Sequence, residues 1–336
     1  MPTGSDVNVF AWMKASPWRM VLPTCATLFI LTGCHAHRQV TLAIIPRTTG
    51  TALWEPLQGG AETEARRYGY RLYGNAPARE DDVEKQISLV EQVTRHHVQG
   101  IILAPSQSLA LITPVRRALA VGIPAVVVSS PLAMPPSGRL AYVINDEERA
   151  GVICGERIGK LTGGSGVVIV LGVNPDIAGI LTRMRSLESY LARVYPKIIV
   201  VNRYGTLNPI HEQQVAQEAI AQNPTAKAIV GLMWSSTHGA LLAVRDREAG
   251  HSIRVIGFDP DDVPPMDNPD LDSVLVQNTR LMGEQAVALL AGELHGSAMP
   301  PLTKIAPVLI TRENRNSLEV QQVLWPSSGP YSWERP

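Results

Sequence analysis

Short runs of apolar, mostly β-branched residues recur along the chain from Gln39 onward, and they constrain its fold more than any other feature. The runs are VTLAII (40–45), YRLYG (70–74), GIILA (100–104) and IPAVVV (123–128), followed by GVVIVL (166–171), KIIVV (197–201), AIVGL (228–232) and RVIGF (254–258). Apolar runs without alternation are typical of strands buried on both faces of a parallel sheet. The stretches between them carry apolar residues at helical spacing, such as Leu57, Ala61 and Ala65. We therefore expect repeated βαβ units with right-handed crossovers.

Two series of four strands predict two similar doubly wound α/β lobes instead of one large sheet. The break falls near YVIND (142–146), ahead of a helix expected to begin around Glu147. A late strand is expected at DSVLVQN (272–278) and a closing strand at KIAPVLIT (304–311). Asn208-Pro209 predicts a helix N-cap followed by proline in the first helical position.

These elements give expected domain limits. The N-terminal lobe would comprise residues 39–144 plus 279–308, and the C-terminal lobe residues 145–278 plus 309–325. Residues 326–336 show no clear element and are expected to form a tail.

The N-terminal segment has the features of an exported protein. Lys14 and Arg19 precede an apolar stretch, Met20 to Leu31, that is shorter than the roughly 20 apolar residues of a membrane span. Charged residues, a short apolar core and small residues before a cleavage point indicate a secretory signal peptide. The sequence Leu31-Thr32-Gly33-Cys34 resembles the bacterial lipobox, whose cysteine is lipidated and becomes the mature N-terminus.

We therefore expect residues 1–33 to be a lipoprotein signal peptide, Cys34 to carry lipid and residues 34–38 to form a linker. An ordinary signal peptide and a chance buried cysteine are the alternatives. Translation starting at Met13 or Met20 also remains open.

Charge and cysteine content narrow the function classes further. Lys and Arg total 30, and Asp and Glu also total 30, so no basic surplus points to a nucleic-acid partner. Removal of residues 1–33 would leave 303 residues, enough for two medium domains. With Cys25 in the signal and Cys34 lipidated, Cys154 has no disulfide partner. It is expected to pack as a small hydrophobic residue, a reactive thiol being the alternative.

The sequence contains no catalytic or metal motif with the required spacing. GKLTGGSG (159–166) fails as a P-loop because Leu161 follows the lysine, and the chain has no G-x-S-x-G. His96-His97 are sequence neighbours that point to different sides of a helix, so they cannot share a metal ion. The acidic segment 259–272 lacks the glycine and terminal glutamate of an EF-hand loop. We expect no enzyme activity, no cofactor and no metal.

Several segments, taken in order, resemble the ribose-type periplasmic sugar-binding proteins, the substrate-binding proteins of ABC transporters that share their fold with the ligand-binding core of the lactose-repressor family. The matching segments are 44–70, 100–111, GIPAVVVSS (122–130), VIGFD (255–259) and VLVQN (274–278). The resemblance implies two lobes joined by three hinge strands, with the ligand in the cleft between them. Open α/β sheets also favour ligand sites at the carboxyl ends of their strands.

The resemblance implies ligand-binding residues at matching positions. Trp54 would stack on a sugar ring, with Leu53 at a neighbouring aromatic position, and Asp259 would accept sugar hydroxyls. Gln277 can both donate and accept, as a hydroxyl does. A core position for Trp54 and a strand-end cap for Asp259 are the alternatives.

Arginines and a hinge residue complete the implied contacts. Arg183 and Arg185 lie where the family has a ligand-binding arginine, and we favour Arg185. Arg47 occupies the place of a ligand-contacting lysine, and Asn145 marks the first crossover. A surface or hinge role is the alternative for Arg47 and Asn145.

Two pairs depart from the family pattern. Ser129-Ser130 replaces an acidic–basic pair, and Met233-Trp234 replaces Asn-Asp. Both changes remove polar partners, so we expect a ligand that is less polar than ribose, or larger.

The resemblance therefore implies a monomeric, lipid-anchored, extracytoplasmic or periplasmic protein that captures a sugar or sugar-like molecule for an ABC permease. A sensor of the same fold that feeds a receptor kinase or chemoreceptor is the alternative. A DNA-binding repressor is not expected, because the signal segment takes the place of its headpiece.

Overall fold

The computed structural model describes residues 39–49, 53–245, 253–259 and 267–324. The predicted signal peptide, Cys34, the linker 34–38 and the tail 326–336 lie outside the described residues, as do residues 260–266 of the acidic segment 259–272.

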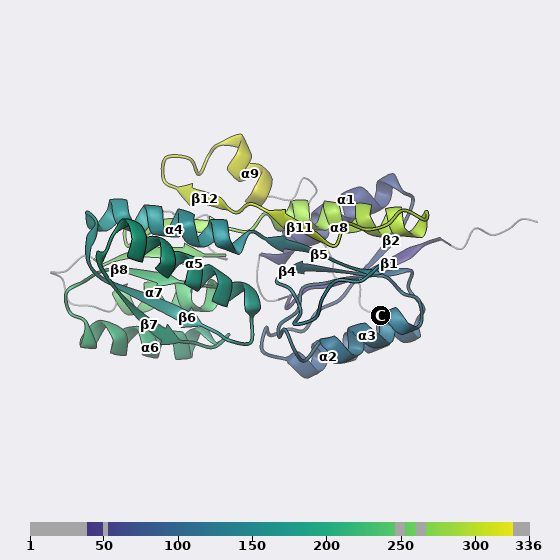
Figure 1. Ribbon diagram of the computed structural model, residues 1–336, viewed down its shortest axis with the longest axis horizontal. Helices are drawn as coiled ribbons and strands as arrows, with labels where there is room; N and C mark the ends of the chain where they lie inside the picture. The colour runs from purple at the N-terminus through teal and green to yellow at the C-terminus, as the bar shows by residue number, and fades with distance from the viewer. Residues whose placement is uncertain (1–38, 50–52, 246–252, 260–266, 325–336) are drawn as a thin grey trace, which may run out of the picture. The chain divides into compact units, whose positions relative to one another are not determined.

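The first sheet is parallel throughout and has the strand order β11-β5-β4-β3-β1-β2. Its strands are β1 (Thr41–Ile45), β2 (Arg71–Gly74), β3 (Gly100–Leu103), β4 (Ala125–Ser129), β5 (Leu140–Asn145) and β11 (Leu302–Ile305). Helices α1 (Trp54–Arg67) and α8 (Thr279–Leu294) cover one face of this sheet, and α2 (Val83–Arg95) and α3 (Ile112–Ala120) cover the other (Figure 1). The first lobe therefore buries its strands between two helical layers.

The second sheet repeats this order as β12-β10-β9-β8-β6-β7. Its strands are β6 (Ser165–Val173), β7 (Lys197–Tyr204), β8 (Ala226–Gly231), β9 (Arg254–Phe258), β10 (Leu271–Val276) and β12 (Val308–Thr311). Helices α4 (Glu147–Thr162) and α5 (Ala178–Val194) pack on one face, and α6 (Pro209–Gln222), α7 (Trp234–Arg245) and the short α9 (Leu318–Leu324) on the other. Position by position, β4 corresponds to β9 and the edge strand β2 to the edge strand β7.

The chain crosses between the two sheets three times within the described residues: after β5, after β10, and between β11 and β12. The expected class, two doubly wound α/β lobes with three crossing segments, is confirmed. The expected N-cap is confirmed too, since the Asn208 side chain accepts hydrogen bonds from the backbone of Ile210 and His211.

The prediction of one closing strand over residues 304–311 is wrong. The segment forms two strands, and β11 runs parallel to β5 whereas β12 runs antiparallel to β10 in the other sheet. Pro307 lies between the two strands, and because proline has no N–H it cannot continue a ladder of hydrogen bonds. The interruption lets the chain change sheets.

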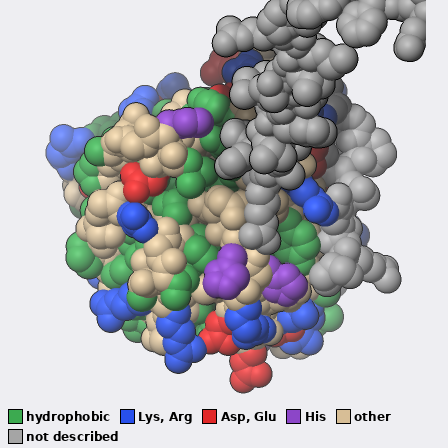
Figure 2. Space-filling model, turned by 90° about the vertical axis from the view of Figure 1, so that its right-hand side faces the viewer, with side chains coloured by type: hydrophobic (Ala, Val, Ile, Leu, Met, Phe, Trp, Pro, Cys, Tyr) green, Lys and Arg blue, Asp and Glu red, His purple; other side chains and the backbone are tan. Residues whose placement is uncertain are grey.

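Charged side chains are spread over the face that Figure 2 shows, without a continuous patch of one sign. This distribution agrees with the formal net charge of +0. A face with mixed charges does not create the strong field of one sign that attracts a highly charged polymer.

Helices α1 and α8 approach each other closely because Gly283 has no side chain. A Cβ at this position would lie 2.2 Å from the carbonyl oxygen of Leu57. We expect Gly283→Ala to lower the free energy of unfolding by about 1–3 kcal/mol, as overpacking does. Urea unfolding followed by circular dichroism measures the change.

Gly292→Ala is the matched control on α8, because its nearest neighbour would be 3.6 Å away at Ser297. It should stabilise the protein slightly through helix propensity. Equal losses for the two variants would contradict the close helix contact.

Candidate functional site

A chain of hydrogen bonds joins the carboxyl ends of strands from both sheets. Ser129, the last residue of β4, donates from Oγ to Gln277 Oε1 at 2.7 Å. Gln277, which follows β10, donates from Nε2 to Asp259 Oδ2 at 2.6 Å and from its backbone N–H to Asp259 Oδ1 at 3.1 Å. All three residues are buried. The predicted residues Ser129, Asp259 and Gln277 therefore form one polar cluster, which we call the central cluster.

Two members of this cluster have an unfavourable backbone conformation. Ser129 has φ 68° and Asp259 has φ 47°, and the only other non-glycine residue with positive φ in the described parts of the chain is His97. Left-handed conformations of this kind are held only where the surroundings impose them, and they gather at functional sites. Since β4 and β9 occupy equivalent places in the two sheets, both lobes have a left-handed residue at the carboxyl end of the same strand.

Arg183, on α5, adds a buried positive charge beside Asp259. Its Nε and Nη2 donate to the two carboxylate oxygens of Glu147 at 2.7 and 3.0 Å, and Nη2 lies 3.8 Å from Asp259 Oδ2. The guanidinium also lies 4.1 Å from the centre of the Phe258 ring. Burial alone would lower the pKa of Arg183, but Glu147 and Asp259 together raise it above its ordinary value. The guanidinium therefore stays charged and holds both carboxylates in place.

The preference for Arg185 over Arg183 does not hold in the structure. Ile180, Arg183 and Leu187 fall on the buried side of α5, whereas Arg185 is exposed. A helix places residues three and four apart on one side, so a residue two positions away from Arg183 faces elsewhere. Arg183 joins the central cluster and Arg185 does not.

Arg47 and Trp54 lie against each other next to Ser130. Arg47 donates from Nε to the carbonyl of Pro105 at 3.0 Å and from Nη2 to Ser130 Oγ at 3.2 Å. Its guanidinium carbon lies 5.5 Å from the Trp54 ring centre. Trp54 is fully buried in the core of the first lobe, and its indole N–H finds no hydrogen-bond partner in the described part of the chain. The structure thus places Trp54 in the core while keeping it in contact with the site through Arg47.

The remaining predicted residues surround these groups. Leu53 packs against the core of the first lobe, and Met233 is buried in the core of the second. Asn145 is buried at the first crossing, and its side-chain amide makes no hydrogen bond of standard geometry to any described residue. Burial raises the pKa of the neighbouring Glu147 carboxyl, and Arg183 and Asn145 oppose this shift. Trp234 lines a cavity instead.

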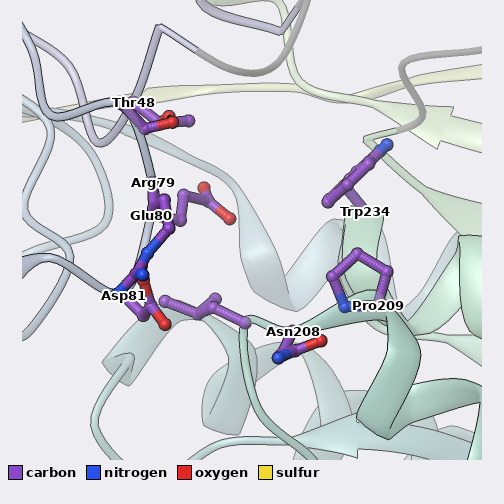
Figure 3. Close-up of a pocket in the computed structure, with 9 residues that line it drawn as sticks. Thr48, Arg79, Glu80, Asp81, Asn208, Pro209 and Trp234 are labelled. Atoms are coloured by element: carbon purple, nitrogen blue, oxygen red, sulfur yellow. Dashed lines mark hydrogen bonds and ion pairs between the residues drawn. The ribbon is translucent and has the colours of Figure 1, made fainter.

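The cavity has a volume of about 300 Å³ and lies between residues of the two lobes (Figure 3). Its walls come from the loops after β1, β2 and β7 and from the starts of α6 and α7. Its residues are Thr48, Ala78, Arg79, Glu80, Asp81, Leu207, Asn208, Pro209 and Trp234. We call it the edge pocket, because β2 and β7 are the equivalent edge strands. Glu80 and Asn208 were not predicted as pocket residues, because loops so far apart in sequence give no signal that they meet.

The described residues offer no alternative centre of metal or thiol chemistry. They contain no group of three or more His, Cys, Asp or Glu residues able to hold a metal ion. Cys154 is buried in the second lobe's core, and burial raises the pKa of its thiol to about 12, as expected for a packed, unreactive side chain. None of the helices in the described ranges has the length and apolar composition that crossing a bilayer requires.

Glu212, on α6, supports the wall of the edge pocket from behind. Its Oε1 accepts a hydrogen bond from the backbone N–H of Thr206, and Ser235 Oγ donates to the Thr206 carbonyl at 3.0 Å. Its Oε2 is buried and accepts no hydrogen bond from any described residue. Burial raises the pKa of this carboxyl from 4.5 to about 7.

A carboxyl group whose pKa is higher in the folded than in the unfolded protein ionises first in the unfolded state. Its contribution to stability is therefore fully present below the unfolded pKa and is lost as the pH rises through the folded pKa. The Glu212 contribution should therefore fall between about pH 4.5 and 7. Glu212→Gln keeps an acceptor for Thr206 but cannot ionise. Relative to this variant, the wild type should lose up to roughly 3 kcal/mol of unfolding free energy over that interval. Urea unfolding at several pH values measures the difference, and parallel pH profiles would rule out a buried, ionisable Glu212.

The chain is similar in sequence to known binding proteins. A family model described as a periplasmic binding protein domain matches residues 42–298. A D-ribose/D-allose-binding protein of Pseudomonas aeruginosa is 24% identical over 255 residues, which cover 71% of this chain and 77% of that protein. A D-apiose import binding protein of Paraburkholderia graminis is 26% identical over 285 residues, which cover 84% of this chain and 87% of that protein.

A solved structure shows the same fold. An ABC transporter solute-binding protein from Agrobacterium vitis, bound with alpha-D-tagatopyranose, matches with a TM-score of 0.79 and 22% identity. The match covers 85% of this chain and 99% of that protein. The two-lobe architecture is therefore shared over almost the whole length of a sugar-bound relative.

Proposed function

The chain belongs to the periplasmic binding protein family, and we propose that it captures a sugar or sugar-like molecule between its lobes and delivers it to an ABC permease. The relatives named above bind ribose, allose or apiose, and they span most of this chain. The protein binds and releases its ligand without chemical change. We place the lobes at residues 39–144 plus 279–308 and residues 145–278 plus 309–325, limits that lie within one residue of the end of β5 and the start of β12.

The observation that carries this proposal is the hydrogen-bonded chain Ser129–Gln277–Asp259. It draws on both lobes, and two of its members have strained backbones. An amide, a hydroxyl and a carboxylate offer donors and acceptors together, which suits hydroxyl groups that themselves donate and accept. A ligand hydroxyl can take the place of the Ser129–Gln277 bond, so that the ligand completes the contact between the lobes.

The ligand is less polar or larger than ribose. Ser129-Ser130 and Met233-Trp234 supply less charge than the pairs they replace, and Met233 is buried. Hydrogen bonds to charged groups contribute about 1.5–3 kcal/mol each, so their loss selects against a small, fully hydroxylated sugar.

Isothermal titration of the purified protein against a panel of neutral sugars and glycosides tests this function. We expect at least one member to bind, and Asp259→Asn to weaken that binding by about tenfold or more, because one charged hydrogen bond is lost. Arg185→Ala is the control and should bind normally, since Arg185 is exposed on α5. Absence of binding by the wild type, or equal affinity in Asp259→Asn, would contradict the proposal.

The protein is held at the membrane by lipid on Cys34. The lipobox Leu31–Cys34 supports this anchor, and stable attachment requires more than one acyl chain. We expect Cys34→Ser to release the protein into the aqueous phase on detergent partitioning. A variant that still partitions with detergent would argue against lipidation at Cys34.

A further inference from the structure

The edge pocket and the central cluster lie at the carboxyl ends of different strands. The cluster is built at β4, β9 and β10, beside the crossings, whereas the pocket is built on the loops that follow the edge strands β2 and β7. None of Ser129, Arg183, Asp259 or Gln277 lines the pocket. The two are therefore separate compartments along one row of loops.

Arg47 connects these compartments. It follows β1, which lies between β2 and the more central strands of the first sheet. Its Nη1 lies 4.0 Å from Glu80 Oε1 in the pocket, and its Nη2 donates to Ser130 Oγ at 3.2 Å next to the cluster. A ligand anchored at the cluster can therefore extend past Arg47 into the pocket.

One side of the pocket is apolar and flat. Trp234 is half-buried, and its ring stacks on His238 with 5.7 Å between ring centres and an interplanar angle of 22°. Pro209 lies on the same side of the pocket as Trp234 in Figure 3, and Leu207 adds further apolar surface to the lining. An indole face held in this way offers a surface for the C–H face of a sugar ring or for an aromatic ring.

The opposite side carries the carboxylate of Glu80, to which no described residue donates a hydrogen bond. The Glu80 side chain is 11% exposed, and Figure 3 shows it directed into the cavity across from Trp234. Among the residues that the structure describes, none donates a hydrogen bond to it, and burial raises the pKa of its carboxyl. Such a group gains a partner when a ligand hydroxyl enters the pocket.

The charges around the pocket are already balanced. Arg79 and Asp81 form a 2.8 Å ion pair at the exposed rim, and Glu80 faces Arg47. A cationic ligand would therefore meet no unbalanced negative charge. A neutral hydroxylated ring fits this arrangement better than an amine.

We propose that the edge pocket is an outer subsite that receives a second ring of the ligand, so that the protein takes a disaccharide or a glycoside with a ring-sized substituent. Its volume of about 300 Å³ stands at the lower end of the range for ligand pockets, which suits one ring and not a longer chain. The inference rests on the proposed sugar capture and specifies the ligand class.

Isothermal titration with matched probes tests the subsite. Ribose, allose, galactose and glucose are each compared as methyl glycoside, as phenyl glycoside and within a disaccharide. For at least one sugar, the ring-bearing probe should bind tenfold or more tightly than the methyl glycoside. This gain should fall below threefold in Trp234→Ala, which removes the flat wall.

Ala78→Trp fills the pocket from the loop after β2, outside the central cluster. It should abolish the gain from the second ring while the methyl glycoside binds as in the wild type. Tyr204→Ala is the matched control, because Tyr204 is 75% exposed and does not line the pocket, and it should retain the gain. Glu80→Gln should reduce the gain for disaccharides more than for phenyl glycosides, which offer no hydroxyl to this carboxylate.

The outcomes separate the subsite from the function on which it rests. If methyl glycosides bind and a second ring adds nothing, the subsite is overturned and sugar capture stands. Tighter binding of 2-amino sugars than of their neutral counterparts, lost in Glu80→Gln, would also overturn it in favour of a cation site. If no saccharide binds, both the subsite and the proposed function fail.

Discussion

The buried carboxylate of Asp259 is the group around which both lobes are organised. A charge removed from water must be paired and hydrogen-bonded, or its burial is strongly unfavourable. Gln277 meets this requirement with two hydrogen-bond donors, and Arg183 meets it with a nearby guanidinium. Gln277 follows β10 and Arg183 lies on α5. Because Gln277 also accepts from Ser129, the requirement of one carboxylate extends to the first lobe. The lobes thus share a polar interior where each sheet ends.

The matching strand orders explain why the site lies where it does. Both sheets place equivalent strands at equivalent positions, so the loops after β4 and β9 form one pair and those after β2 and β7 another. The first pair carries the strained residues Ser129 and Asp259, and the second pair encloses the edge pocket. Repetition of one lobe plan therefore yields two compartments whose walls are each contributed by both lobes.

The strands and the two-lobe plan could be predicted because buried parallel strands leave continuous apolar runs in the sequence. Pro307 is a sequence signal for the division of residues 304–311 into β11 and β12. The apolar residues on both sides of it nevertheless favoured the prediction of one strand. The choice between Arg183 and Arg185 required the phase of α5, which Ile180 and Leu187 reveal once the helix limits are known. The resemblance alone favoured Arg185, which is exposed, whereas Arg183 is the arginine buried beside Asp259.

The carboxylates were harder to predict. Glu147 and Glu212 stand in the first turns of helices, where acidic residues are common for reasons of helix electrostatics. Their burial depends on packing against Arg183 and against the loop at Thr206, which are distant in sequence. Glu80 likewise lies in a polar loop without a motif. It is recognised as a pocket residue only in the structure, where Trp234 lies across the cavity from it.

The burial of Cys154 makes the protein suited to selective labelling. Maleimide dyes react with thiolates, and a thiol with a pKa of about 12 inside the core is inert to them. In a form that begins at residue 39, a cysteine introduced by Asp81→Cys at the rim of the edge pocket would be the one thiol that such a dye modifies. Ligand binding in the pocket would change the surroundings of a fluorophore at this position and therefore its emission. The labelled protein would then report carbohydrate binding optically.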